Sequence, residues 1–117
     1  MIANSDKSTA RRAEFFEIAK ATKDRDVLKR LLASEDFRWF FLRLLRTCKV
    51  YQDTYTGDND TFRNEGMRRI GLILLKQVED LGLEGLKLKQ LAEIEHVNEA
   101  ERMLKKIREK EKENNAK

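Results

Sequence analysis

The segment from Ser34 to Val78 most constrains the fold, because it contains two apolar helical patterns joined by a polar connection. Ser34 can cap the first free amides of a helix, and the acidic residues Glu35 and Asp36 suit the positive end of the helix dipole. At about 100° per residue, the apolar residues that follow share one broad face. They are Phe37, Phe40, Phe41, Leu44, Leu45 and Cys48. We therefore predict an aromatic helix with a wide apolar wall.

The opposite side of this helix carries Trp39, Arg43 and Arg46. One interpretation is a solvated face on which arginine stems lie over the indole ring. The other is a contact patch, because tryptophan and arginine dominate binding hot spots. The sequence leaves both interpretations open.

Residues 49–61 predict an irregular connection, with turn residues at 56–59 and a cap for the next helix at Asp58 or Asp60. Tyr51 and Tyr55 are expected to fold this loop back onto the domain. The acidic residues lack the alternating ligands, central glycine and closing glutamate of a calcium loop, so we predict no metal there.

A second helix is expected from about Thr61 to Leu81. Its buried side is predicted to hold Phe62, Met67, Ile70, Ile73, Leu74 and Val78. Gly66 and Gly71 lie on or beside that side, and glycine costs roughly 1 kcal/mol relative to alanine inside a helix. Two glycines there predict the close approach of a neighbouring helix.

A basic surface on the outer side of this helix is formed by Arg63, Arg68 and Arg69. These arginines either pair with Glu65 in solvent or form a site for phosphates or an acidic partner.

The amino-acid composition of the chain favours long helices. Among 117 residues there is no proline and there are five glycines, while 39% are charged. One small all-α domain follows: a helical bundle with a central hairpin and a projecting C-terminal helix. With 25 basic and 21 acidic residues, charge permits DNA contact without demanding it. The single cysteine, Cys48, forms no intrachain disulfide and is expected to be buried and inert.

The chain order is predicted as a flexible N-terminus (1–7), a helical globular domain (8–82), an amphipathic C-terminal helix (83–112) and a disordered tail (113–117). Ser8 or Thr9 is expected to open a helix that ends near Ala21. A break at residues 22–24 precedes a short helix through Ala33. The apolar face of that short helix is Val27, Leu28, Leu31 and Leu32.

Gly82 is expected to end the second helix. The C-terminal helix that follows has a thin apolar seam of Leu88, Leu91, Ile94, Val97, Ala100, Leu104 and Ile107. Such a seam is too narrow for a globular core and favours packing along another helix, so we predict an oligomer.

Catalytic and metal-binding patterns are weak. His96 has the Glu-x-x-His spacing of di-iron bundles with Glu93, but those bundles need two such motifs and further glutamates. We expect a surface histidine, no cofactor and no metal. Cys48 and His96 lie on different helices, and there is no phosphate-binding glycine loop or nucleophile elbow. We therefore predict no catalytic residues and no enzymatic activity.

The ordered motifs resemble a family of small helical proteins of short-tailed bacteriophages. The resemblance covers residues 24–80 and rests on the segments 37–48, 56–58 and 65–72. Where the family has Gly-Arg-Arg before the aromatic run, this chain has Asp36-Phe37-Arg38. Family members are described as a phage domain of unknown function and are encoded near capsid, scaffold and portal genes. The resemblance implies a role in virion assembly.

Two hypotheses follow. In the first, the chain is a structural protein that uses its C-terminal helix to join copies of itself or a phage scaffold, portal or capsid protein. In the second, arginines of both helices contact the phosphates of DNA. We expect no membrane partner, because no apolar run approaches the ~20 residues that span a bilayer. The host cytoplasm during assembly, and then the virion, are the expected locations.

Overall fold

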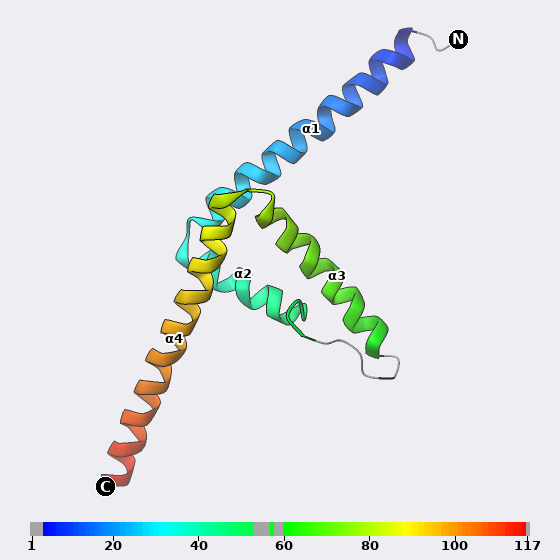
Figure 1. Ribbon diagram of the computed structural model, residues 1–117. Helices are drawn as coiled ribbons and strands as arrows, with labels where there is room; N and C mark the ends of the chain where they lie inside the picture. Colours follow the sequence, from blue (N-terminus) through cyan, green and yellow to red (C-terminus); the bar gives the residue numbers. More distant parts are fainter. Residues whose placement is uncertain (1–3, 53–56, 58–59, 117) are drawn as a thin grey trace.

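The computed structural model describes residues 4–52, 57 and 60–116 (Figure 1). Within these residues there are four helices and no strand, which confirms the all-α prediction. The helices are α1 (Asn4–Leu32), α2 (Glu35–Thr47), α3 (Asp60–Glu79) and α4 (Leu83–Ala116). The short helix α2 contacts each of the other three.

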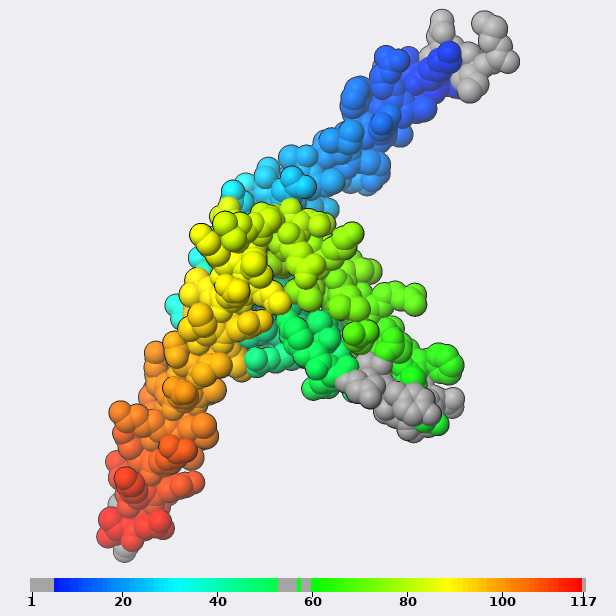
Figure 2. All heavy atoms as spheres, in the orientation of Figure 1, coloured from blue at the N-terminus to red at the C-terminus, as the bar shows by residue number. Residues whose placement is uncertain are grey.

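The molecule is extended, because α1 and α4 leave the central body in opposite directions (Figures 1 and 2). Its radius of gyration is 21.7 Å and its principal extents are 87 × 39 × 23 Å. A compact domain of this length would have a radius of gyration of about 13 Å. We call the body the region where the four helices meet, and the arms the exposed ends of α1 (residues 6–26) and α4 (residues 101–116).

Helix α1 is continuous, so the predicted break at residues 22–24 is wrong. The Thr22 hydroxyl donates to the Ile18 carbonyl at 3.0 Å, which satisfies this side chain inside the helix. The helix also begins at Asn4, before the expected caps Ser8 and Thr9 and inside the segment predicted to be flexible. Only its last turns enter the body: Leu32 is buried, while Leu28 is half-buried.

The predicted start of α2 is confirmed, because the Phe37 amide donates to the Ser34 hydroxyl at 3.4 Å. The predicted apolar face is largely buried, although Phe40 is 47% exposed. Its members join the buried cluster of Leu32, Phe41, Leu45, Cys48, Val50 and Val78. Arg38 and Leu42, which lie off this face, are also buried. Helix α2 therefore buries residues on more than one side, as expected for the helix that the others contact.

Half of the residues that we predicted to be buried in α3 are exposed. Val78 is buried, and Met67 and Leu74 are half-buried. Phe62, Ile70 and Ile73 instead point to solvent and are 82%, 58% and 54% exposed. Apolar residues occupy two faces of this helix, and the sequence alone did not show which face packs.

Gly71 decides the packed face of α3. A Cβ built on Gly71 would lie 2.7 Å from the Cys48 Cβ and still closer to Val50, so the end of α2 can approach only a glycine. The predicted close approach is therefore confirmed at Gly71. At Gly66 it is wrong, because no described atom lies within 4 Å of an added Cβ.

The predicted glycine stop after α3 is confirmed. Gly82 has φ +77°, in the left-handed region, and its amide donates to the Glu79 carbonyl at 2.9 Å. Gly85, three residues later, is buried against the backbone of Val78. Helix α4 therefore starts directly against the last turn of α3.

The predicted apolar seam of α4 is divided between two faces. Leu88 packs on the core, and Ala92, outside the predicted set, is buried. Five seam residues are 40% to 57% exposed: Leu91, Ile94, Val97, Leu104 and Ile107. Steps of three residues drift by about 60° around a helix, so such a seam cannot stay on one partner. The helix continues to Ala116, through residues 113–116 for which we expected disorder.

Candidate functional site at the crossing of α2 and α4

The crossing of α2 and α4 is centred on Arg38, which is only 8% exposed. Its Nε and Nη2 donate to the two carboxylate oxygens of Glu95 at 2.5 and 3.0 Å. Its Nη1 donates to the Leu32 carbonyl, at the end of α1, at 2.8 Å. The hydrogen bond to Glu95 raises the pKa of Arg38, which therefore stays charged. One guanidinium thus joins three helices through charge-assisted bonds.

The next residue on each helix extends this crossing. The ring of His96 stacks on the indole of Trp39, with centroids 4.6 Å apart and planes inclined by 24°. Arg46 donates from Nη1 to His96 Nε2. Because arginine can only donate, Nε2 accepts, and the proton of the neutral imidazole is on Nδ1. His96 is therefore a half-buried residue at the edge of the crossing, with contacts to Trp39 and Arg46.

The environment of His96 favours its neutral form. Its Nδ1 is buried and has no hydrogen-bond partner among the described residues. Burial first, and then the positive charge of Arg46, lower the pKa of His96 below its ordinary value of 6.5. A charged imidazolium is disfavoured here for both reasons.

The structure separates the predicted Trp39, Arg43 and Arg46 patch. Trp39, on α2, is half-buried under α4. Arg46, also on α2, contacts His96 of α4. Arg43 remains exposed, with its guanidinium carbon 5.7 Å from the centroid of the Phe40 ring. Trp39 and Arg46 therefore contact another helix of the same chain.

The three α3 arginines lie on a different helix from this crossing. Arg63 and Arg69 are exposed, and Arg68 is half-buried. They are not joined to the α2 arginines by any interaction described in residues 4–52, 57 and 60–116.

Sequence reasoning missed the pair of Arg38 and Glu95. The only signal was the position of Arg38 inside the family-like motif, between two aromatic residues of an apolar helix. Glu95 gave no signal, because acidic residues are frequent along α4. Their proximity depends on how two helices 57 positions apart cross.

The connection before α3 is described only in part. Tyr51 is 51% exposed, and Lys89 Nζ lies 5.9 Å from the centroid of its ring. Gly57 has φ +79°, as suits a turn. The predicted roles of Tyr55, Thr56, Asp58 and Asn59 fall outside the described residues.

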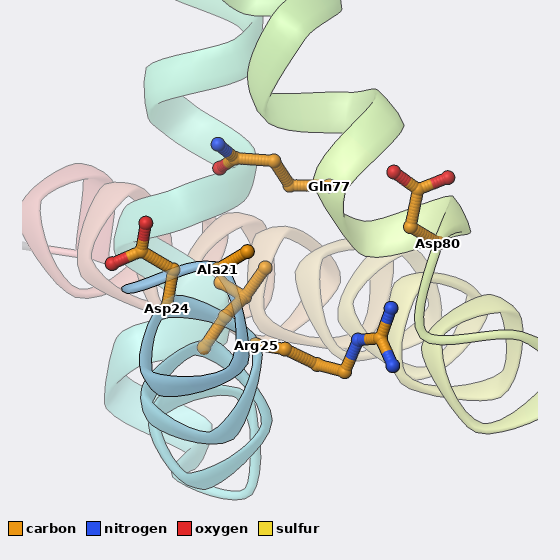
Figure 3. Close-up of a pocket in the computed structure, with 6 residues that line it drawn as sticks. Ala21, Asp24, Arg25, Gln77 and Asp80 are labelled. Carbon is orange, nitrogen blue, oxygen red and sulfur yellow. The ribbon is translucent and has the colours of Figure 1, made fainter. Parts of the chain in front are cut away.

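A cleft of about 200 Å³ lies between α1 and the end of α3 (Figure 3). In Figure 3, Arg25 extends toward the side where Asp80 lies, while Asp24 and Gln77 lie across from them. The cleft is lined by Ala21, Asp24, Arg25, Leu28, Gln77 and Asp80. This lining has no histidine, cysteine or hydroxyl side chain, so it offers no nucleophile paired with a base.

The described part of the chain contains no group of three histidine, cysteine or acidic residues arranged to hold a metal ion. The described helices also include none that is long and apolar enough to cross a membrane. The polar groups at the crossing of α2 and α4 bond to one another, so the crossing has the chemistry of a contact between helices.

These features define a small all-α protein in which a helix crossing carries two projecting arms. A family model described as Bbp19-like phage protein matches residues 28–93, which is more than half of the chain. The chain belongs to the Bbp19-like phage protein family, and its role is phage-related. The predicted resemblance to a phage family is thus confirmed. No curated protein and no solved structure matches the chain.

The matched range includes the body and leaves out most of both arms. It begins at Leu28, in the last turns of α1, and ends at Glu93, before Glu95 and His96. Arg38 and Trp39 are therefore inside the matched range, while their partners in α4 follow directly after it.

Proposed function

We propose that this chain is a non-enzymatic phage assembly protein that acts through protein–protein contacts in virion morphogenesis. The α4 arm is its partner-binding element. The observation that carries the proposal is that every residue from 101 to 116 is exposed, although the arm contains large apolar side chains. Met103, Leu104 and Ile107 are 46%, 50% and 51% exposed.

The apolar residues of the arm share one face with Ala100, which directly precedes the arm and is half-buried. Ala100, Met103, Leu104 and Ile107 follow the i, i+3, i+4, i+7 spacing of a helix that packs on another helix. We call them the arm stripe. Most of the stability of a protein helix comes from packing of such a face rather than from helix propensity. A partner that covers the arm stripe would supply that packing.

The crossing of α2 and α4 supports the same proposal. The Arg38–Glu95 pair and the Trp39–His96 stack hold α4 on the body just before the arm begins. The arm is therefore presented at a fixed direction, which lowers the entropy lost when a partner binds. We propose a phage scaffold, portal or capsid protein as this partner.

The arm stripe is tested by mixing the full chain with the scaffold, portal and capsid proteins of its phage, each separately, and measuring complex formation by analytical ultracentrifugation. We expect one of them to bind. The double variant Leu104→Lys, Ile107→Lys should lose this binding. The matched control, Lys105→Ala with Glu109→Ala, changes the opposite side of the arm and should bind as the native chain does. Equal binding by the stripe variant, or binding by none of the three proteins, would contradict the proposal.

DNA binding has less support from the arrangement of the basic residues. Arg43, Arg46, Arg63 and Arg69 are exposed, but they are divided between two helices, and Arg46 also contacts His96. If the chain were a DNA-binding module, its affinity for duplex DNA would fall steeply as salt concentration rises. We expect no such salt-dependent binding.

A further inference from the structure

The outer face of α3 is a second exposed apolar surface. Phe62, Ile70 and Ile73 lie within one quarter of the helix circumference at about 100° per residue, and each is more than half exposed. Gly66 lies between them on the same face and is also exposed. This set, Phe62, Gly66, Ile70 and Ile73, is the α3 outer face. It is turned away from Gly71 and Val78, which pack on the body.

Gly66 is unexplained by the packing within one chain. A glycine inside a helix costs roughly 1 kcal/mol relative to alanine. Gly71 offsets this cost because the end of α2 approaches it, but an added Cβ at Gly66 would meet no described atom within 4 Å. The α3 outer face thus has a notch at Gly66, bordered by three large apolar side chains.

We propose that the α3 outer face binds the same face of a second copy of this chain, with the two α3 helices antiparallel. A twofold axis near residue 68 places Ile70 of each copy over the notch at Gly66 of the other. The same register places Phe62 of each copy near Ile73 of the other. The face is therefore complementary to itself in shape, as a twofold interface requires.

The charges beside the face fit the same arrangement. Glu65, Arg69 and Lys76 lie along one edge of the α3 outer face. Because a twofold axis keeps matching edges together, Glu65 of each copy lies beside Arg69 of the other. Opposite charges thus meet across the twofold axis, which favours a second copy of the chain as the partner.

This inference goes beyond the proposed contact of the α4 arm, because the two surfaces lie on different helices. The arm stripe is tested by changes at Leu104 and Ile107, and the α3 outer face by changes at Gly66 and Ile73. If the variants of one surface contradict its proposal, the proposal for the other surface is still tested by its own variants.

The first experiment measures the mass of the full chain over a range of concentrations by light scattering. We expect a dimer of the native chain. Gly66→Leu should raise the dissociation constant at least about tenfold, because its side chain fills the notch. Measured at a concentration at which both chains are monomeric, the same change should not lower the melting temperature, because leucine favours a helix over glycine. Loss of the dimer would then not be caused by misfolding.

A matched pair of isoleucines supplies the control. Ile73 and Ile94 are 54% and 57% exposed on α3 and α4. Ile73→Lys should abolish the dimer, while Ile94→Lys should leave it intact. The proposal is overturned if the native chain is monomeric up to its solubility limit, or if Gly66→Leu and Ile73→Lys remain dimeric.

Cross-linking tests the antiparallel register. Cys48 is buried, so cysteines introduced at position 66 or 70 are the exposed thiols. A mixture of the Gly66→Cys and Ile70→Cys variants should form disulfide-linked dimers faster than either variant alone. Faster cross-linking of Gly66→Cys with itself would indicate parallel helices and overturn the proposed register.

Discussion

Apolar residues at the same helical spacing have opposite environments in the body and in the α4 arm. In α2, Leu42 and Leu45 are 2% and 1% exposed. In the arm, Leu104 and Ile107 are separated by the same three residues but are 50% and 51% exposed. The spacing of apolar residues therefore identifies the face of a helix that is able to pack. Whether that face is covered depends on which other helix the chain brings to it.

The body differs from the arm in one further respect, since polar groups also fix the contacts there. Arg38 and Glu95 align α4 on α2, whereas the arm stripe has no polar group that selects a partner within the described chain. Three predictions test this difference between body and arm.

The largest effect is expected from leucine truncation. Leu45→Ala should lower the free energy of unfolding by about 2–5 kcal/mol, because it removes buried methyl groups and leaves a cavity. Leu104→Ala in the arm should change it by less than about 0.5 kcal/mol. Urea unfolding followed by circular dichroism measures both. A similar loss of unfolding free energy in the two variants would show that the arm is packed in solution. It would contradict the proposed difference between body and arm.

An intermediate effect is expected at the helix crossing. Glu95→Leu should lower the free energy of unfolding of the body by roughly 2 kcal/mol, because it leaves Arg38 without its counter-charge at a part-buried contact. The double variant Arg38→Met, Glu95→Leu should lose less than the sum of the single changes. A double-mutant cycle of unfolding free energies gives this coupling. Additive losses would mean that the pair does not hold the crossing.

The smallest effect concerns the pH dependence of His96. Its pKa is lowered in the folded chain, so the unfolded chain binds more protons as the pH falls below about 7. Stability should therefore decrease on acidification through the region below the unfolded pKa of 6.5. His96→Phe keeps a ring over Trp39 but does not titrate, and its unfolding free energy should vary less with pH. An equal pH slope for both chains would assign the effect to other groups.

Local signals in the sequence predicted the parts of the fold that depend on a few neighbouring residues. The serine cap of α2 and the glycine stop after α3 involve bonds within four residues, and both are confirmed. The family motif was recognisable for the same reason. The break predicted in α1 was wrong because Thr22 can bond either outside or inside a helix, and here it bonds to Ile18.

Long-range contacts were not predictable from one sequence. The α3 helix has two apolar faces, and only the approach of Cys48 and Val50 to Gly71 selects one of them. Trp39 and Arg46 were recognised as a pair on one side of α2, but their partner His96 is on a helix whose position the sequence did not fix. Arg38 and Glu95 were missed because each is an ordinary charged residue until α2 and α4 cross.

The three bonds of Arg38 have a mechanical consequence. The same guanidinium holds the last carbonyl of α1 and the carboxylate of Glu95 in α4. Arg38 therefore fixes the direction of α4 relative to both α1 and α2 where the arms leave the body. The ion pair of Lys29 and Glu84, 3.1 Å apart, joins α1 to α4 directly, so the two arms of an 87 Å molecule are anchored to each other by both contacts.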